Sequence, residues 1–253
     1  MQLILTALPN IPLIQPGDDL AAIILRGLEN AHLELHDGDV LVLAQKIVSK
    51  AEGRMVRLRD VTPSPRAITL AHASAKDARL CEVILWDTRE ILRVRKGLII
   101  VETKHGWVCA NAGVDRSNVA PHDENEWVLR LPEDADASAR CLCERLRVLT
   151  AREVGIVIND SHGRAWRNGA VGVAIGVAGI PAVEDWRGVP DLFGYPLQVT
   201  TVGLADQIAS AASLLQGQAN EGRPIVHVRG VPMTHRDGSA REIVRAREND
   251  LFR

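Results

Sequence analysis

The stretch Val40-Leu41-Val42-Leu43-Ala44 is an unbroken apolar run, and Gln45-Lys46-Ile47-Val48-Ser49-Lys50 follows it directly. A short apolar run without polar alternation is typical of a strand that is covered on both faces. Polar side chains at the end of such a strand lie where α/β folds commonly bind ligands. The stretch therefore predicts a central buried strand, with polar groups placed for a ligand just beyond it.

A second apolar run, Val154-Gly155-Ile156-Val157-Ile158, has the same form and leads straight into Asn159-Asp160-Ser161-His162-Gly163. Further back in the chain, residues 97–101 and 108–110 form a predicted hairpin, and the polar segment 111–118 follows it. We therefore expect polar groups at the ends of three strands.

Helical patterns alternate with these runs, which predicts a mixed α/β (α+β) fold of two lobes. Asp18 or Asp19 is the expected N-cap of the first helix. The expected helices cover residues 20–30, 63–80, 81–92, 136–150, 206–215 and 239–253.

Composition narrows the class of protein. Of the 253 residues, 46% are hydrophobic and 25% are charged, which is the profile of a globular protein. The formal charge of -2 lacks the basic excess that non-specific nucleic-acid binding needs. No apolar run is long enough to cross a bilayer, and the N-terminus shows no secretory pattern. We expect a cytoplasmic protein that binds neither nucleic acid nor membrane.

Several common catalytic signatures are absent from the sequence. It has no Walker A motif, no G-x-S-x-G elbow, no H-E-x-x-H motif and no C-x-x-C pair. The closest cysteines, Cys141 and Cys143, do not have zinc-ligand spacing, so we expect reduced thiols. Gly172, Gly176 and Gly179 lack the dinucleotide-fingerprint spacing, and we interpret them as sites of close packing.

The remaining chemistry consists of oxygen ligands and cations near strand ends. Asp115, Asp160 and Ser161 offer two carboxylates and a hydroxyl, which suit Mg²⁺ or Mn²⁺. Lys46 and Lys50 could balance phosphate charge. Arg164 and Arg167 could each hold a carboxylate or a phosphate in a fork.

Each of these residues also has a structural interpretation. An Asp after a strand often caps a helix or forms a turn. The two lysines fit solvated strand ends, and His105 and His162 fit surface or turn positions. From the residues alone, the interpretation stops at a possible site for Mg²⁺ and phosphate.

Four multi-residue segments occur in an order that resembles a known enzyme family. They are Leu8-Pro9-Asn10-Ile11-Pro12-Leu13-Ile14 with Pro16-Gly17-Asp18-Asp19-Leu20; Asp37-Gly38-Asp39-Val40-Leu41-Val42 with Val48-Ser49-Lys50-Ala51-Glu52-Gly53-Arg54; Asn111-Ala112-Gly113-Val114-Asp115-Arg116-Ser117-Asn118; and Asn159-Asp160-Ser161-His162-Gly163-Arg164-Ala165-Trp166-Arg167. The coenzyme F-420:L-glutamate ligases have similar segments in the same order. The resemblance extends over nearly the whole chain, as far as Val228-Arg229-Gly230.

The resemblance implies a GTP-dependent, GDP-forming ligase that joins L-glutamate to the terminal carboxylate of the deazaflavin F-420-0. Some members extend the product as a γ-linked polyglutamate tail. The resemblance also implies two divalent metal ions, Mg²⁺ or Mn²⁺, a monovalent cation, K⁺, and a homodimer. It further implies a two-lobed, mixed-sheet architecture particular to the family, neither P-loop nor Rossmann, with residues 1–253 as one unit of two intertwined lobes.

Carried over by position, the resemblance implies that Asp115 and Asp160 bind the first metal ion and Ser161 the second. It implies that Lys50 acts in catalysis and, with Asn118, contacts GTP. The implied nucleotide pocket also contains Ile11, Pro12, Leu13, Ile14, Gln45 and Lys46. The implied loop over the nucleotide consists of Gln216, Gly217, Gln218, Ala219, Asn220, Glu221, Gly222 and Arg223.

Two positions depart from the family pattern. Gln218 stands where some relatives place a carboxylate for the second metal ion, and Gln207 follows Asp206 where an Asp-Glu pair is frequent. A neutral amide oxygen is a weaker Mg²⁺ ligand than a carboxylate, so second-metal binding through Gln218 is the prediction most affected.

Two alternative functions use the same residues. The first is a two-metal phosphohydrolase, in which water is the nucleophile. The second is a non-catalytic metal-nucleotide sensor, which Gln207 and Gln218 favour. All three functions require Asp115 and Asp160 to converge on a common cation.

Overall fold

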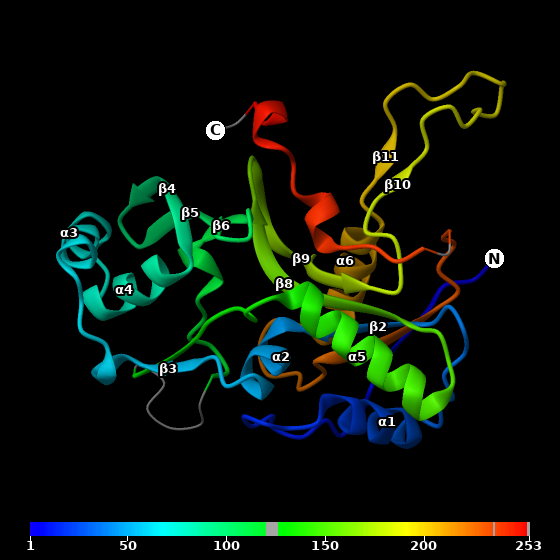
Figure 1. Ribbon diagram of the computed structural model, residues 1–253, viewed down its shortest axis with the longest axis horizontal. Coiled ribbons are helices and arrows are strands. Elements are labelled where there is room, and N and C mark those ends of the chain that lie inside the picture. The colour runs from blue at the N-terminus through cyan, green and yellow to red at the C-terminus, as the bar shows by residue number, and fades with distance from the viewer. Residues whose placement is uncertain (120–125, 235, 252–253) are drawn as a thin grey trace.

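The computed structural model describes residues 1–119, 126–234 and 236–251. Its main sheet has five strands in the order β1-β12-β2-β8-β9 (Figure 1). They are β1 (Ile4–Ala7), β12 (Ile225–Arg229), β2 (Val40–Ala44), β8 (Gly155–Arg164) and β9 (Arg167–Ala178). The β2 and β8 strands run parallel, and the other neighbouring pairs are antiparallel. The predicted mixed α/β class is confirmed.

The central strand β2 is covered on both faces, as its apolar run predicts. Leu41 and Leu43 belong to one core, whereas Val40 and Val42 belong to the other. This division follows from the alternation of side chains along a strand. All four side chains are fully buried.

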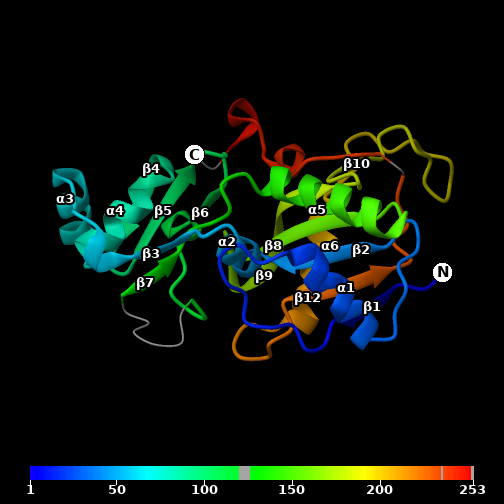
Figure 2. The same cartoon turned by 60° about the horizontal axis from the view of Figure 1, so that its bottom comes forward.

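Helices occupy both faces of the main sheet. The first core is built with α1 (Leu20–Asn30), α2 (Gln45–Ala51) and α5 (Ala135–Thr150), and α1 and α5 lie side by side over the sheet (Figures 1 and 2). The second core is built with α6 (Leu204–Gln216). The first helix begins as expected, because Asp19 accepts hydrogen bonds from the amides of Ala21 and Ala22.

Two glycines of β9 allow these helices to approach the sheet. A Cβ at Gly172 would lie 2.5 Å from the carbonyl oxygen of Ala209 in α6, and one at Gly176 would lie 2.4 Å from that of Ala135 in α5. No side chain fits at such distances. The interpretation of these glycines as packing sites is confirmed.

A smaller lobe lies to the left in Figure 1 and has its own apolar core. Its helices α3 (Pro65–Ser74) and α4 (Ala78–Trp86) pack with a sheet of β4 (Thr88–Arg95), β5 (Leu98–Thr103) and β6 (Val108–Ala110). The β5–β6 hairpin was predicted. A second small sheet pairs β3 (Met55–Arg57) with β7 (Trp127–Leu129).

An arm and a tail complete the described chain. The arm begins at the short pair β10 (Glu184–Asp185) and β11 (Thr201–Val202) and projects from the body (Figure 1). The tail contains the short 3-10 helices η3 (Ala240–Ile243) and η4 (Arg247–Asn249). Among the described residues, no helix is both long and apolar enough to cross a membrane.

Three expected elements differ from the structure. The helix expected at 81–92 ends at Trp86, because residues 88–95 pair with β5 as a strand. The helix expected at 63–80 is interrupted at Ala75, which adopts φ 52°. The tail helix expected at 239–253 is wrong: η3 ends in an extended residue, Val244, and η4 is a separate short turn.

Candidate active site

The first turn of α2 places three polar side chains beside Asp115. Buried Gln45 accepts a hydrogen bond from Ser49 Oγ at 2.9 Å and presents Nε2 to Asp115 Oδ2 at 3.3 Å. Lys46 Nζ lies 3.1 Å from the same carboxylate oxygen and 2.8 Å from Ser117 Oγ. The predicted polar end of β2 therefore meets the segment that follows β6.

Lys50 lies one turn further along α2. Its ammonium donates a 2.6 Å hydrogen bond to the backbone oxygen of Asn118. Burial, and then the positive charge of Lys46, lower the pKa of Lys50. The two lysines thus concentrate positive charge where anionic oxygen can be compensated.

Asp115 and Asp160 come from different lobes and lie close enough to interact. Burial raises the pKa of the Asp115 carboxyl; Lys46 opposes this effect, and the negative charge of Asp160 adds to it. Burial and the charge of Asp160 also raise the pKa of the Cys109 thiol in β6 to about 12. The structure therefore brings Asp115 and Asp160 together.

The β8 strand carries its polar residues on two faces. The sequence predicted that this strand ends before Asp160. In the structure it continues to Arg164, because it pairs with β9 past a bulge at residues 158–159. Asp160 and Ser161 are successive strand residues, so their side chains point to opposite faces. They are therefore suited to contact different ions, which is the division that the resemblance implies.

Ser161 faces the segment that follows α6. Its hydroxyl donates a 2.8 Å hydrogen bond to Gln218 Oε1, and Asn159 Nδ2 donates one of 2.8 Å to Gln216 Oε1. Asn159 Oδ1 is buried without a hydrogen-bond partner in the part of the chain that the structure describes. The 216–223 loop is thereby fastened to β8.

The same loop also reaches Asn118. Asn118 Nδ2 donates a 2.8 Å hydrogen bond to the backbone oxygen of Ala219. Gly217 ends α6 with φ 73°, and the loop then folds around the Glu221 carboxylate, which accepts a hydrogen bond from the Ala219 amide. Asn220, Gly222 and Arg223 complete the exposed part of this loop.

The remaining predicted nucleotide residues, 11–14, lie in the segment between β1 and α1. Ile14 is buried and Ile11 is half-buried. Pro12 and Leu13 are exposed. The Gly17 amide donates a 2.8 Å hydrogen bond to the backbone oxygen of Ala51, which ties the end of this segment to α2. Arg164 and Arg167 lie at the β8–β9 turn.

His162 occupies a different position from the one expected. Its side chain is largely buried, and Nε2 lies 3.0 Å from Asp160 Oδ2 in a geometry that makes no hydrogen bond. A strand residue two positions from a predicted ligand shares its face, and this period-two signal could have identified His162. His105 is exposed, as expected, and all four cysteines are free thiols.

The oxygen donors fit a hard divalent cation. Two carboxylates, the Ser161 hydroxyl and the Gln218 amide oxygen are the ligand types that Mg²⁺ and Mn²⁺ accept. Within the described ranges, no group of three or more His, Cys, Asp or Glu residues forms a metal cluster. A metal ion here would therefore need hydroxyl, amide or phosphate oxygens besides the two carboxylates.

Comparison with known proteins identifies the family of the chain. The family model described as F420-0:Gamma-glutamyl ligase matches residues 9–230. The chain is 44% identical to the coenzyme F420:L-glutamate ligase of Methanothermobacter thermautotrophicus over 100% of both chains. It is 49% identical to that of Methanopyrus kandleri, over 95% of this chain and 93% of the relative. The chain belongs to the F420-0:gamma-glutamyl ligase family.

Proposed function

We propose that this ligase joins L-glutamate to F-420-0 and uses GTP, which is converted to GDP and phosphate. The observation that carries the proposal is the convergence of Asp115 and Asp160 from two lobes, beside Lys46 and Lys50. Paired carboxylates next to half-buried ammonium groups suit the binding of a metal-nucleotide complex. The 44% identity to a coenzyme F420:L-glutamate ligase over the full chain supports the choice of substrates.

We propose that the site holds two divalent cations, Mg²⁺ or Mn²⁺. Asp115 and Asp160 would hold the first, and Ser161 with Gln218 would hold the second. When bound, the ions supply positive charge that offsets charge on the phosphates. Asn118, Lys46 and Lys50 would contact GTP, and residues 11–14 with the 216–223 loop would enclose it.

The proposed reaction has two steps. A carboxylate oxygen of F-420-0 attacks the γ-phosphorus, the bond to the β–γ bridging oxygen breaks, and GDP leaves with the electron pair. The amine of glutamate, after loss of one proton, attacks the acyl carbon; the C–O bond to phosphate breaks, phosphate leaves, and a second proton is released. Lys50 offsets charge on the transferred group, and the protein positions the reactants.

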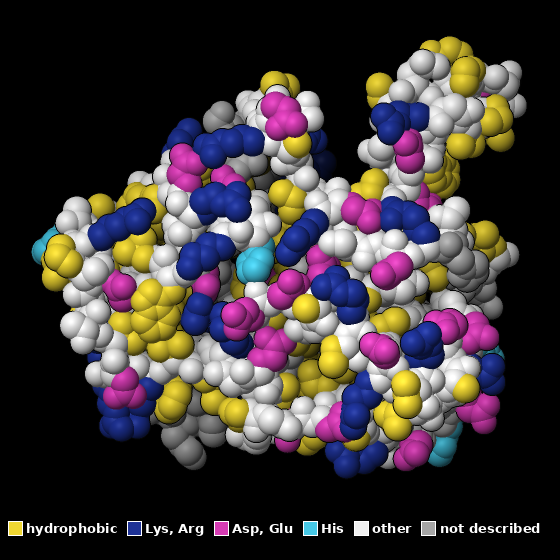
Figure 3. Space-filling view, viewed as in Figure 1, with side chains coloured by type: hydrophobic (Ala, Val, Ile, Leu, Met, Phe, Trp, Pro, Cys, Tyr) yellow, Lys and Arg dark blue, Asp and Glu magenta, His cyan; other side chains and the backbone are white. Residues whose placement is uncertain are grey.

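We propose that the chain acts as a homodimer. The arm exposes Trp186, Val189, Leu192, Phe193, Tyr195 and Val199. Figure 3 shows apolar side chains gathered on this projection. Exposed apolar groups in one place mark interaction surfaces more often than scattered ones do. We further propose a cytoplasmic enzyme that uses K⁺ and in which residues 1–253 act as one unit.

The proposed function is tested by supplying GTP with Mn²⁺ and omitting one substrate at a time. We expect phosphate release and a product one glutamate heavier than F-420-0 only when both F-420-0 and L-glutamate are present. Mass spectrometry identifies the product. Rapid phosphate release without either acceptor would indicate the phosphohydrolase instead, and tight GTP binding without turnover would indicate the sensor.

A further inference from the structure

A cavity lies next to the proposed metal site. It has a volume of about 240 Å³ and is formed by the β8–β9 hairpin, β6 and its preceding turn, the start of α6 and the tail. Its walls include Trp107, Val108, His162, Val173, Asp206 and Arg245. None of these residues belongs to the proposed nucleotide site. The cavity is large enough for a small polar metabolite.

One wall of the cavity carries a carboxylate that no Lys or Arg neutralises. Asp206 Oδ1 accepts a 2.9 Å hydrogen bond from the Ala174 amide. Among the described residues no Lys or Arg pairs with Asp206. Burial raises the pKa of its carboxyl, and the hydrogen bond from Ala174 and the nearby His162 oppose this effect. A partly buried carboxylate without a Lys or Arg partner is costly, and an ammonium group of a ligand would offset that cost.

The opposite charge is found on the tail. Arg245 lines the cavity with an exposed side chain and makes no hydrogen bond or ion pair within the described ranges. A guanidinium can hold a carboxylate through two parallel hydrogen bonds. Asp250 also lines the cavity and has an interaction of its own. Asp206 and Arg245 have no ion-pair partner among the described residues, and together they complement an amino-acid zwitterion.

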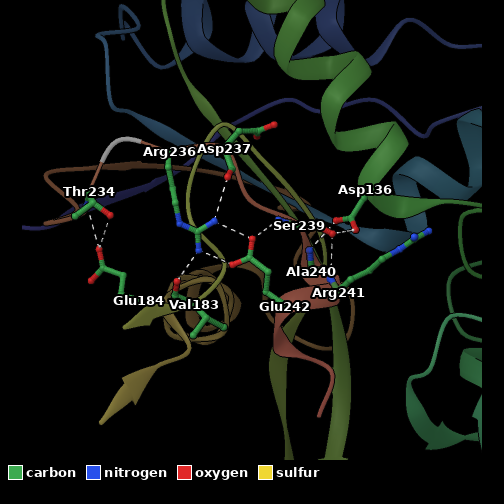
Figure 4. Close-up of polar contacts among 10 residues, drawn as sticks. All are labelled: Asp136, Val183, Glu184, Thr234, Arg236, Asp237, Ser239, Ala240, Arg241 and Glu242. Carbon is green, nitrogen blue, oxygen red and sulfur yellow. Dashed lines mark hydrogen bonds and ion pairs between the residues drawn. The ribbon is translucent and has the colours of Figure 1, made fainter. Parts of the chain in front are cut away.

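The tail wall is fixed by a polar network (Figure 4). Buried Asp136 accepts hydrogen bonds from Ser239 Oγ at 2.5 Å and from the Ala240 amide at 2.9 Å. Arg236 forms a two-pronged ion pair with Glu242, at 2.8 and 2.5 Å. These contacts hold η3, which ends two residues before Arg245, against α5 and β9.

The cavity adjoins Asp160 through His162. The His162 ring, which lines the cavity, lies with Nε2 3.0 Å from Asp160 Oδ2, and both residues lie on the same face of β8. A ligand held here would lie near Asp160 of the proposed metal site. An amine that attacks an acyl phosphate must lie close to the site where that acyl phosphate forms.

We propose that this cavity is the L-glutamate site, in which Asp206 binds the ammonium group and Arg245 binds a carboxylate. The inference rests on the proposed function and places the amino-acid substrate within it. Both residues bind and orient the amino acid. Removal of either charge therefore weakens the binding of glutamate and leaves phosphate transfer to F-420-0 intact.

The test separates the two reaction steps. Hydroxylamine captures the acyl phosphate of F-420-0 as a hydroxamate without any amino acid. We expect Asp206→Asn and Arg245→Gln to raise the KM for L-glutamate about 10- to 100-fold, as for a charged hydrogen bond that is lost. Hydroxamate formation and the KM for GTP should stay unchanged. The Asp206→Asn substitution keeps a side-chain oxygen for the Ala174 amide, so the fold is expected to survive.

Matched controls use exposed residues away from the cavity, Asp60→Asn and Arg140→Gln, whose glutamate KM should not move. An unchanged glutamate KM in both cavity variants would overturn the inference. A raised KM for F-420-0 alone would overturn it as well, because the cavity would then hold the acceptor. Absence of hydroxamate in the unmodified enzyme would instead count against the proposed function.

Discussion

Lys46 Nζ lies 3.1 Å from Asp115 Oδ2, and this ion pair joins α2 of the main lobe to the segment after β6 in the smaller lobe. The same carboxylate feels the charge of Asp160 from β8. The site is therefore assembled where the two lobes meet, and each of its charges depends on the other lobe for its surroundings.

The first prediction concerns the cost of keeping Asp115 charged. Burial raises the pKa of the Asp115 carboxyl above the ordinary value of 3.8. The carboxyl therefore has no effect on the stability of the metal-free fold below pH 3.8, and its charge destabilises that fold fully once the pH exceeds the folded pKa. Asp115→Asn should leave the free energy of unfolding at pH 7 unchanged or higher, while ligase turnover falls at least about 100-fold. Chemical denaturation and product assays measure the two effects. A strongly destabilised variant would contradict this account of the carboxylate.

The second prediction concerns Gln218, whose Oε1 accepts a hydrogen bond from Ser161 Oγ. Gln218→Glu supplies a carboxylate at the proposed second metal site, and carboxylates bind Mg²⁺ and Mn²⁺ more strongly than amides do. We expect Mn²⁺ affinity in the presence of GDP to rise about tenfold, as measured by calorimetry. Gln2→Glu, an exposed change at the N-terminus, serves as the control. Equal affinity in the two variants would argue against a metal ion at Gln218.

The third prediction concerns Asp39, which lies immediately before β2. Burial alone would raise the pKa of its carboxyl, but hydrogen bonds from Arg229 and His227 outweigh burial and hold the pKa at about 2. A lowered carboxyl pKa stabilises the fold above 3.8, and this contribution is lost as the pH falls towards about 2. The shift corresponds to about 2 kcal/mol at neutral pH.

Asp39→Asn should therefore lose at least about 2 kcal/mol of unfolding free energy at pH 7, and the difference from the unmodified protein should shrink as the pH falls from 4 to 2. Urea denaturation across this range measures it, with Asp60→Asn as an exposed control. A difference that does not depend on pH would show that the ion pair is not its source.

The fourth prediction concerns the arm. Leu192 and Phe193 are 99% and 95% exposed, which is costly for apolar side chains in water. We expect the unmodified protein to sediment as a dimer and the double variant Leu192→Ser/Phe193→Ser to dissociate at least about tenfold more readily. Gln198→Ser on the same arm is the control. An unchanged dimer in the double variant would place the interface elsewhere.

Local patterns predicted much of this fold. The apolar run at residues 40–44 predicted a strand buried on both faces, and Asp19 caps the helix at residues 20–30 as expected. These elements depend on neighbours in sequence. By contrast, β8 continues through Asp160 because β9 pairs with it, and the tail forms short turns that Asp136 anchors. Such long-range contacts leave little trace in the local sequence.

The site was predicted in part. Residue types and strand ends indicated Asp115, Asp160 and Lys46, but their closeness depends on how two lobes pack. His162 was expected at the surface and is instead largely buried against Asp160. The local sequence did not indicate Asp206 as a ligand-binding residue, because its proposed role depends on a cavity that the distant tail helps to form.

The most direct test of the account is Mn²⁺ binding by the unmodified protein, Asp115→Asn, Asp160→Asn and the double variant, each with GDP. If both carboxylates hold one shared ion, each single variant should lose that same ion, and the double variant should lose no further one. Electron paramagnetic resonance counts the bound ions. Loss of one ion in each single variant but two in the double variant, or no loss in either single variant, would contradict a shared site.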